Sequence, residues 1–177
     1  MDVPEQHHPR YSQRAFPPYR FISGENPHPT ESPQGHSYQK KEHGVEPLIL
    51  TQWAKNQDYL FAIDLYNYAF WWESHEAWEG LWRQTSSSDL SHQFLQGLIK
   101  ISAAFLKWHQ HHQNGLEHLY VGGIEHLKHV CQQKEIYMGI DLMAHIAKLS
   151  VHFRGVIADE AYWPDPLVNY PFIVLEQ

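Results

Sequence analysis

The chain has 177 residues, a size typical of one domain with its own hydrophobic core. Its formal net charge is −7 and its pI is about 6.1, which argues against a broad nucleic-acid-binding surface and against a polybasic membrane anchor. A single Cys excludes an internal disulfide framework and a zinc site built from Cys pairs. Because no long apolar run and no secretory signal pattern is present, we expect a cytoplasmic protein that does not enter a membrane.

Proline and tryptophan divide the chain into two regions. Eight of the 11 Pro lie in residues 1–47, whereas all seven Trp lie beyond residue 50. Residues 1–47 have neither a helical nor a strand period, and Pro restricts φ and lacks an amide donor. We therefore expect a Pro- and His-rich N-terminal arm over 1–47, extended or partly disordered, followed by a helical domain over 48–177.

Apolar residues recur at helical spacing beyond residue 48 and predict five helices. The expected helices cover residues 57–66, 70–85, 90–109, 116–130 and 142–153. Asn56 and Asp141 are suitable N-cap residues, and Asn114 with Gly115 breaks the pattern before the fourth helix. Short polar connections favour antiparallel neighbours, so the predicted fold class is all-α, a compact antiparallel bundle of about five helices. The Pro-interrupted apolar residues 162–175 are expected to form a non-helical C-terminal strap across it.

The helix predicted over 70–85 carries the most informative side chains. At about 100° per residue, one narrow sector holds Trp71, His75, Trp78 and Trp82. The adjoining sector holds Trp72, Glu76, Glu79 and Arg83. Aromatic residues at helical spacing are usually core residues, so the Trp sector is expected to face the interior. A semi-buried cluster of His, Glu and Arg would then lie at the edge of the interior, where burial and neighbouring charges shift pKa values.

Two interpretations of this cluster remain open. In the first, His75, Glu76 and Glu79 share general acid–base work in a hydrolase-like protein, or His75 and Glu79 bind a divalent metal. The zinc-protease pattern His-Glu-x-x-His is not matched, because Glu79 replaces the second His. The Glu-x-x-His pattern of di-iron bundles is not matched either, because Trp72 precedes His75 by three residues. In the second interpretation, the same side chains form a buried polar network that fixes helix packing.

Four segments resemble one family, and the order of the first two is specific to it. They are NYAFWWESHEAWEGLWR at Asn67–Arg83, FLQGLIKISAA at Phe94–Ala104, NGLEHL at Asn114–Leu119 and GID at Gly139–Asp141. Together they make residues 57–150 similar to the domain-of-unknown-function family 309. The resemblance implies a compact all-α bundle without an assigned activity, and it places the polar positions of the family on Glu73, His75, Glu76, Glu79, Arg83, Gln96 and Gly97. The chain departs from the family pattern at Ala69, Ser74 and Gly80, where Gly, Ala and Glu are usual.

Residues outside the helix at 70–85 could add to its cluster. Gly97 lies near the apolar stripe of the helix over 90–109, and its missing side chain would let the Trp-rich face of helix 70–85 approach closely. Gln96 would then either reach the carboxylates of that helix or face solvent. If the arm folds back over helix 70–85, His28 or His36 could complete a site that this helix cannot complete alone.

The sequence leaves two functional hypotheses. The favoured one is a structural or protein-interaction module that binds a protein partner or a second copy of the chain. The alternative is a metal-binding or hydrolase-like protein that uses His75, Glu76 and Glu79. Whether the protein is an enzyme stays open, and a divalent metal is the one cofactor that the residues suggest. Nucleic-acid binding is not expected, because the residues between the aromatic rings are acidic.

Overall fold

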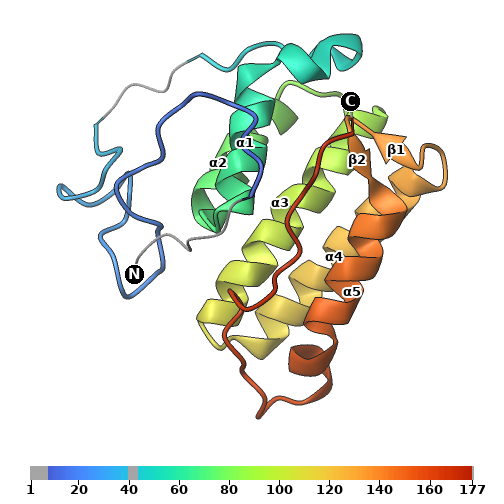
Figure 1. Ribbon diagram of the computed structural model, residues 1–177. Helices are drawn as coiled ribbons and strands as arrows, with labels where there is room; N and C mark the ends of the chain where they lie inside the picture. Colours follow the sequence, from blue (N-terminus) through green and yellow to red (C-terminus); the bar gives the residue numbers. More distant parts are fainter. Residues whose placement is uncertain (1–7, 40–43, 177) are drawn as a thin grey trace.

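Five α-helices form a bundle in the computed structural model, which describes residues 8–39 and 44–176 (Figure 1). They are α1 (Gln57–Asn67), α2 (Trp71–Trp82), α3 (Leu90–His109), α4 (Gln113–Cys131) and α5 (Leu142–Ala158). Helices that follow one another along the chain also pack against one another. The predicted all-α bundle is therefore confirmed. No helix in the described part of the chain is both long and apolar enough to cross a membrane.

The predicted N-caps of α1 and α5 are present. Asn56 Oδ1 accepts a hydrogen bond from the backbone N–H of Tyr59 at 2.8 Å. Asp141 Oδ1 accepts one from the N–H of Ala144 at 2.9 Å. Each cap pairs a donor that the first helical turn leaves without a backbone partner, which explains why these two helices begin where the sequence predicts.

The predicted start of the fourth helix is wrong. Asn114 and Gly115 lie inside α4, which begins at Gln113. His112 acts as the N-cap, because its Nδ1 accepts a hydrogen bond from the N–H of Gly115 at 3.0 Å. An imidazole cap is less common than a Ser, Thr, Asp or Asn cap, and the Asn-Gly pair resembles a turn signal.

The sequence analysis did not predict a short 3-10 helix and two short strands. A 3-10 helix covers Leu50–Lys55, and the strands β1 (Ile136–Tyr137) and β2 (Ile140–Asp141) form an antiparallel hairpin before α5. Met138 and Gly139 connect the strands, both with positive φ. Strands of two residues are too short to show an alternating pattern, so periodicity could not reveal them.

The Trp-rich face of α2 forms part of the core. Trp71 and Trp78 are fully buried, and the ring of Trp71 stacks on Phe105 of α3 with centroids 4.3 Å apart. Trp82 is half-buried and lies against His92, with ring centroids 4.6 Å apart. The expectation that this sector faces the interior is confirmed for Trp71 and Trp78, whereas Trp82 lies at the border of the core.

The C-terminal residues cross the bundle without helix or strand, as predicted (Figure 1). The fully buried side chain of Asn67, at the end of α1, holds this strap: its Nδ2 donates to the carbonyl of Ile173 and its Oδ1 accepts from the N–H of Ile173, both at 2.7 Å. The indole N–H of Trp108 in α3 donates to the carbonyl of Pro164 at 2.8 Å. Side chains of the bundle thus supply the partners that a sheet would otherwise give to this extended backbone.

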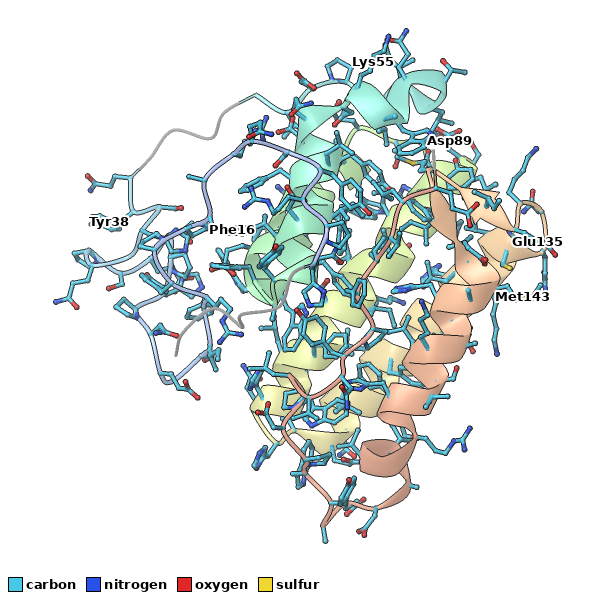
Figure 2. All side chains as sticks on the ribbon, viewed as in Figure 1. Phe16, Tyr38, Lys55, Asp89, Glu135 and Met143 are labelled. Atoms are coloured by element: carbon cyan, nitrogen blue, oxygen red, sulfur yellow. The ribbon has the colours of Figure 1, made fainter. Side chains whose placement is uncertain are left out.

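Residues 8–39 of the N-terminal arm are extended with turns and lie beside α1 and α2 (Figures 1 and 2). Phe16 stacks on Phe70 with centroids 5.0 Å apart, and the guanidinium of Arg10 lies 4.0 Å from the centre of the Phe16 ring. Residues 1–7 and 40–43 of the predicted arm lie outside the described residues. The arm is the segment that determines the surroundings of the polar residues on α2.

Candidate functional site

Three polar residues of α2 lie together at the surface, as the helical spacing predicts. His75 Nδ1 lies 3.3 Å from Glu76 Oε1, and His75 Nε2 lies 3.6 Å from Glu79 Oε1. The other carboxylate oxygen of Glu79 accepts a hydrogen bond from Arg83 at 2.6 Å. We call His75, Glu76, Glu79 and Arg83 the outer cluster.

The outer cluster is more exposed than the sequence suggested. The exposed fraction of the side chain is 23% for His75, 45% for Glu76 and 61% for Arg83. Hydrogen bonding with His75 lowers the pKa of Glu76, while partial burial opposes this effect and the charges of His75, Arg83 and His28 add to it. Water screens such ion pairs, so the outer cluster contributes little to stability. Each imidazole nitrogen of His75 faces a carboxylate oxygen, so the ring lies between Glu76 and Glu79.

Glu73 does not belong to the outer cluster, although it lies on the same helix. Its side chain is 5% exposed, and its Oε1 accepts hydrogen bonds from the N–H of Phe21 at 3.0 Å and interacts with His36 Nε2 at 3.2 Å. The charge of Glu73 also counteracts the burial that lowers the pKa of Arg20, another buried residue of the arm. Glu73 therefore binds the arm where the arm covers α2.

Gly35 explains how His36 reaches Glu73. A Cβ atom placed on Gly35 would lie 2.2 Å from the carbonyl oxygen of His28 and 2.3 Å from that of Pro29. The chain can make this turn only because glycine lacks a side chain. The turn is also closed by hydrogen bonds, among them one from the N–H of Ser37 to the carbonyl of Pro29 at 2.9 Å.

The arm does fold back over α2, the condition raised by the sequence analysis, and it brings both His28 and His36 to this helix. The ring of His28 lies 5.4 Å from that of Trp72 and 4.9 Å from that of Phe21. His36 pairs with Glu73 and not with the outer cluster. Within residues 8–39 and 44–176, no group of three or more His, Cys, Asp or Glu side chains has a geometry that could hold a metal ion.

A second carboxylate that binds the arm was missed by the sequence analysis. Asp64 of α1 is completely buried, and its oxygens accept hydrogen bonds from the N–H of Tyr11 at 2.7 Å, the N–H of Ser12 at 2.9 Å and the hydroxyl of Ser12 at 2.6 Å. Arg10 Nε donates to the same side chain at 3.2 Å. The one available signal was an Asp in the otherwise apolar run LFAIDLY, where an unpaired carboxylate would be very costly.

The expected neighbours of Gly97 and Gln96 need correction. A Cβ on Gly97 would lie 2.8 Å from the side chain of Leu127 and 3.3 Å from the carbonyl of Gly123, so Gly97 admits α4 and not the Trp-rich face of α2. Gln96 is half-buried on α3, and none of the hydrogen bonds among the described residues joins it to α2. Helical spacing identified a close approach at Gly97 but could not say which helix approaches.

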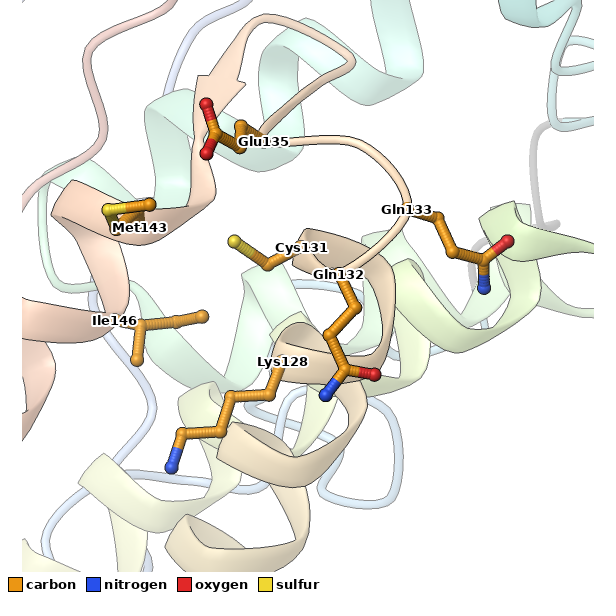
Figure 3. Close-up of a pocket in the computed structure, with 7 residues that line it drawn as sticks. All are labelled: Lys128, Cys131, Gln132, Gln133, Glu135, Met143 and Ile146. Carbon is orange, nitrogen blue, oxygen red and sulfur yellow. The ribbon is translucent and has the colours of Figure 1, made fainter.

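A cavity of about 540 Å³ lies away from these residues, between the end of α4 and the start of α5 (Figure 3). Its lining residues are Lys128, Cys131, Gln132, Gln133, Glu135, Met143 and Ile146. Burial raises the pKa of the Cys131 thiol, with the charges of Glu135 and Asp141 acting in the same direction. None of the polar residues predicted from the sequence lines this cavity.

Comparison with protein families gives a match within the helical region. Residues 59–119 match the family model of DUF309, described as a domain of unknown function. The predicted resemblance is confirmed over these residues, whereas residues 120–150 of the predicted likeness lie outside the match. The DUF309 match spans nearly all of α1, all of α2 and α3, and the beginning of α4, so it contains Asp64, Glu73 and the outer cluster, whereas the arm, α5 and the strap lie outside it. Comparisons with curated proteins and with solved structures give no match.

Proposed function

We propose that the protein is an interaction module in which the outer face of α1 and α2 binds an extended chain segment, a position that its own N-terminal arm occupies. The fully buried Asp64 carries the proposal, since it accepts hydrogen bonds from Arg10, Tyr11 and Ser12 of the arm. A buried carboxylate is tolerated only where donors replace water. Asp64 therefore needs a bound segment that offers backbone N–H groups, a hydroxyl and a cation.

Glu73 supports the same proposal from α2. It binds the backbone N–H of Phe21 and the imidazole of His36, so two carboxylates on neighbouring helices each hold a separate part of the arm. Between these two points Phe16 packs on Phe70. Backbone hydrogen bonds give affinity to an extended ligand, and a packed aromatic side chain gives selectivity. A partner segment with Arg and Ser at the spacing of Arg10 and Ser12 would fit in place of the arm.

The test measures how tightly a fluorescent peptide, with the sequence of residues 8–39, binds to the full-length protein. In the variant with Arg10→Ala and Ser12→Ala, the arm loses side-chain contacts to Asp64 while the receptor face stays intact. We expect the peptide to bind this variant at least tenfold more tightly than the wild type, measured by fluorescence anisotropy. Adding Asp64→Asn should abolish the gain, and Gln13→Ala, at an exposed arm position, serves as the control. Equal binding of the peptide to all variants would contradict the proposal.

The alternative function, a metal-binding or hydrolase-like protein, depends on the outer cluster. It is favoured by one observation, that two carboxylates approach a single imidazole within 3.6 Å. Elemental analysis of the tag-free protein beside His75→Ala and Glu79→Ala tests it, because a bound divalent metal would be present in stoichiometric amount and lost in both variants.

We also propose a cytoplasmic location, since a single half-buried Cys is compatible with a reducing compartment.

A further inference from the structure

The outer face of the α4–α5 pair carries exposed apolar residues, and the charged residues of α5 are all basic. Three large apolar side chains are exposed there, with relative exposures of 43% for Val121, 58% for Met143 and 67% for Val151. In Figure 2, Met143 lies on the outside of the bundle. The protein has a net charge of −7, yet α5 contains Lys148 and Arg154 and no acidic residue.

Contacts between α4 and α5 show which residues of the two helices lie opposite each other. Tyr120 of α4 donates a hydrogen bond to Ser150 of α5 at 3.3 Å, and its ring stacks on Phe153 with centroids 4.7 Å apart. Nearer the start of α4, Gln113 Nε2 donates to the carbonyl of Val156 at 3.1 Å. The helices are therefore antiparallel, with residue 120 of α4 level with residues 150 to 153 of α5.

Val121 and Val151 point to the same side of the helix pair. Val121 comes after Tyr120 and Val151 comes after Ser150, so each is rotated by about 100° from the contact between the two helices. Because α4 and α5 run in opposite directions and face each other, the two rotations bring Val121 and Val151 to the same side of the helix pair. One helical turn away, towards the start of α4 and the end of α5, Glu117 and Arg154 lie on this side too, and both are exposed. The face thus presents one valine from each helix at the same level and, one helical turn away, a Glu on α4 and an Arg on α5.

We propose that this face is the contact between two copies of the chain. A two-fold axis parallel to the helices would set α4 of one copy opposite α5 of the other at the same level. Val121 then meets Val151 of the second copy, and Glu117 meets Arg154. Because the contact is isologous, each pairing occurs twice, and four charges alternate in sign around the axis.

The size of the face determines how strong the contact is. The helices have 19 and 17 residues, which corresponds to lengths of about 28 and 25 Å. A face two helices wide buries roughly 500 Å² on each copy, near the lower limit for a specific interface. Met143 also lines the cavity of Figure 3 near the start of α5, so the contact centres on the two valines. We therefore expect the dimer to be weak.

Analytical ultracentrifugation of the full-length protein between about 1 and 500 µM tests the proposal. The expected result is a monomer–dimer equilibrium that Val151→Asp weakens at least tenfold, while Val168→Asp, at a similarly exposed valine outside the face, leaves it unchanged. Glu117→Lys should weaken the dimer as well, and the further change Arg154→Glu should restore it by exchanging the two charges. Circular dichroism of each variant confirms that the helices remain. A wild-type protein that stays monomeric at 500 µM would overturn the proposal, and so would a dimer that is insensitive to Val151→Asp.

The dimer is independent of the interaction module proposed for α1 and α2. If two copies instead exchanged their arms, the dimer would respond to Asp64→Asn and not to Val151→Asp. That outcome would overturn the α4–α5 contact and leave the proposed binding of extended segments in place. Conversely, a dimer that depends on Val151 while the arm peptide fails to bind would retain the dimer and reject the module.

Discussion

The buried histidine of α5 predicts a specific loss of stability in acid. His145 is 4% exposed, and burial, reinforced by the charge of Lys148, lowers its pKa to about 4 from the ordinary value of 6.5. Its neighbours include the ring of Tyr66, whose centroid lies 6.1 Å away, and its Nε2 has no hydrogen-bond partner among the described residues. The folded protein thus holds this imidazole in the neutral form.

The magnitude follows from the two pKa values. Below pH 6.5 the unfolded chain binds a proton at His145 that the folded chain resists, so the stability contributed by this residue is complete above pH 6.5 and declines as the pH falls towards 4. Each pH unit in this window costs about 1.4 kcal/mol, so the loss is about 2 kcal/mol at pH 5 and about 3 kcal/mol once the folded state is protonated.

Urea unfolding of the wild type and of His145→Gln, followed by tryptophan fluorescence at several pH values between 7.5 and 4.5, measures this contribution. Burial also lowers the pKa of other histidines, among them His109 and His152, so the wild type loses more than the share of His145. The difference between wild type and variant isolates His145, and it should shift by about 2 kcal/mol in favour of the variant between pH 7 and pH 5. His118→Gln, at an exposed position of α4, controls for the substitution itself. A difference that does not vary with pH would refute the reasoning.

Other consequences can be checked by similar means. Gly97→Ala should lower the free energy of unfolding by about 1 to 3 kcal/mol, since its Cβ would collide with Leu127, whereas an unchanged urea midpoint would disprove the close approach of α3 and α4. Asn67→Leu should expose the amide of Ile173 to hydrogen exchange while α3 stays protected, because the pair of hydrogen bonds that holds the strap is lost. Gly35→Ala should increase hydrogen exchange across residues 21–38 of the arm, and Gly44→Ala, at a position with open space, should not; equal effects would argue against the tight turn at Gly35.

The helices were predictable because their signals are local. The positions of α1 and α3 and the start of α5 follow from apolar residues spaced at three and four, with capping side chains at Asn56 and Asp141 for α1 and α5. Helix α5 extends to Ala158, beyond the predicted end at residue 153. The burial of Trp71 and Trp78 followed from the same periodicity. Where the local signal was ambiguous, as at Gly115, the prediction was wrong, because an imidazole cap at His112 took the place of the expected turn.

The candidate site was only partly predictable, for a physical reason. Helical spacing correctly brings His75 and Glu79 together, since it depends only on the backbone of α2. The same spacing cannot distinguish Glu73 from its neighbours, yet Glu73 is buried and Glu76 is exposed, because a segment some fifty residues earlier in the chain covers one and not the other. A helix prediction contains no information on such a covering segment.

The sequence by itself thus determined which residues form helices and which of their sides turn inward, since backbone geometry and hydrophobic burial act over a few residues. The tertiary structure alone decided the partners of the polar residues. Asp64 became a binding site for the arm, and Gly97 admitted α4 instead of α2. Such pairings depend on contacts between distant parts of the chain, where a hydrogen bond or a close approach requires the whole fold to bring two groups within about 3 Å.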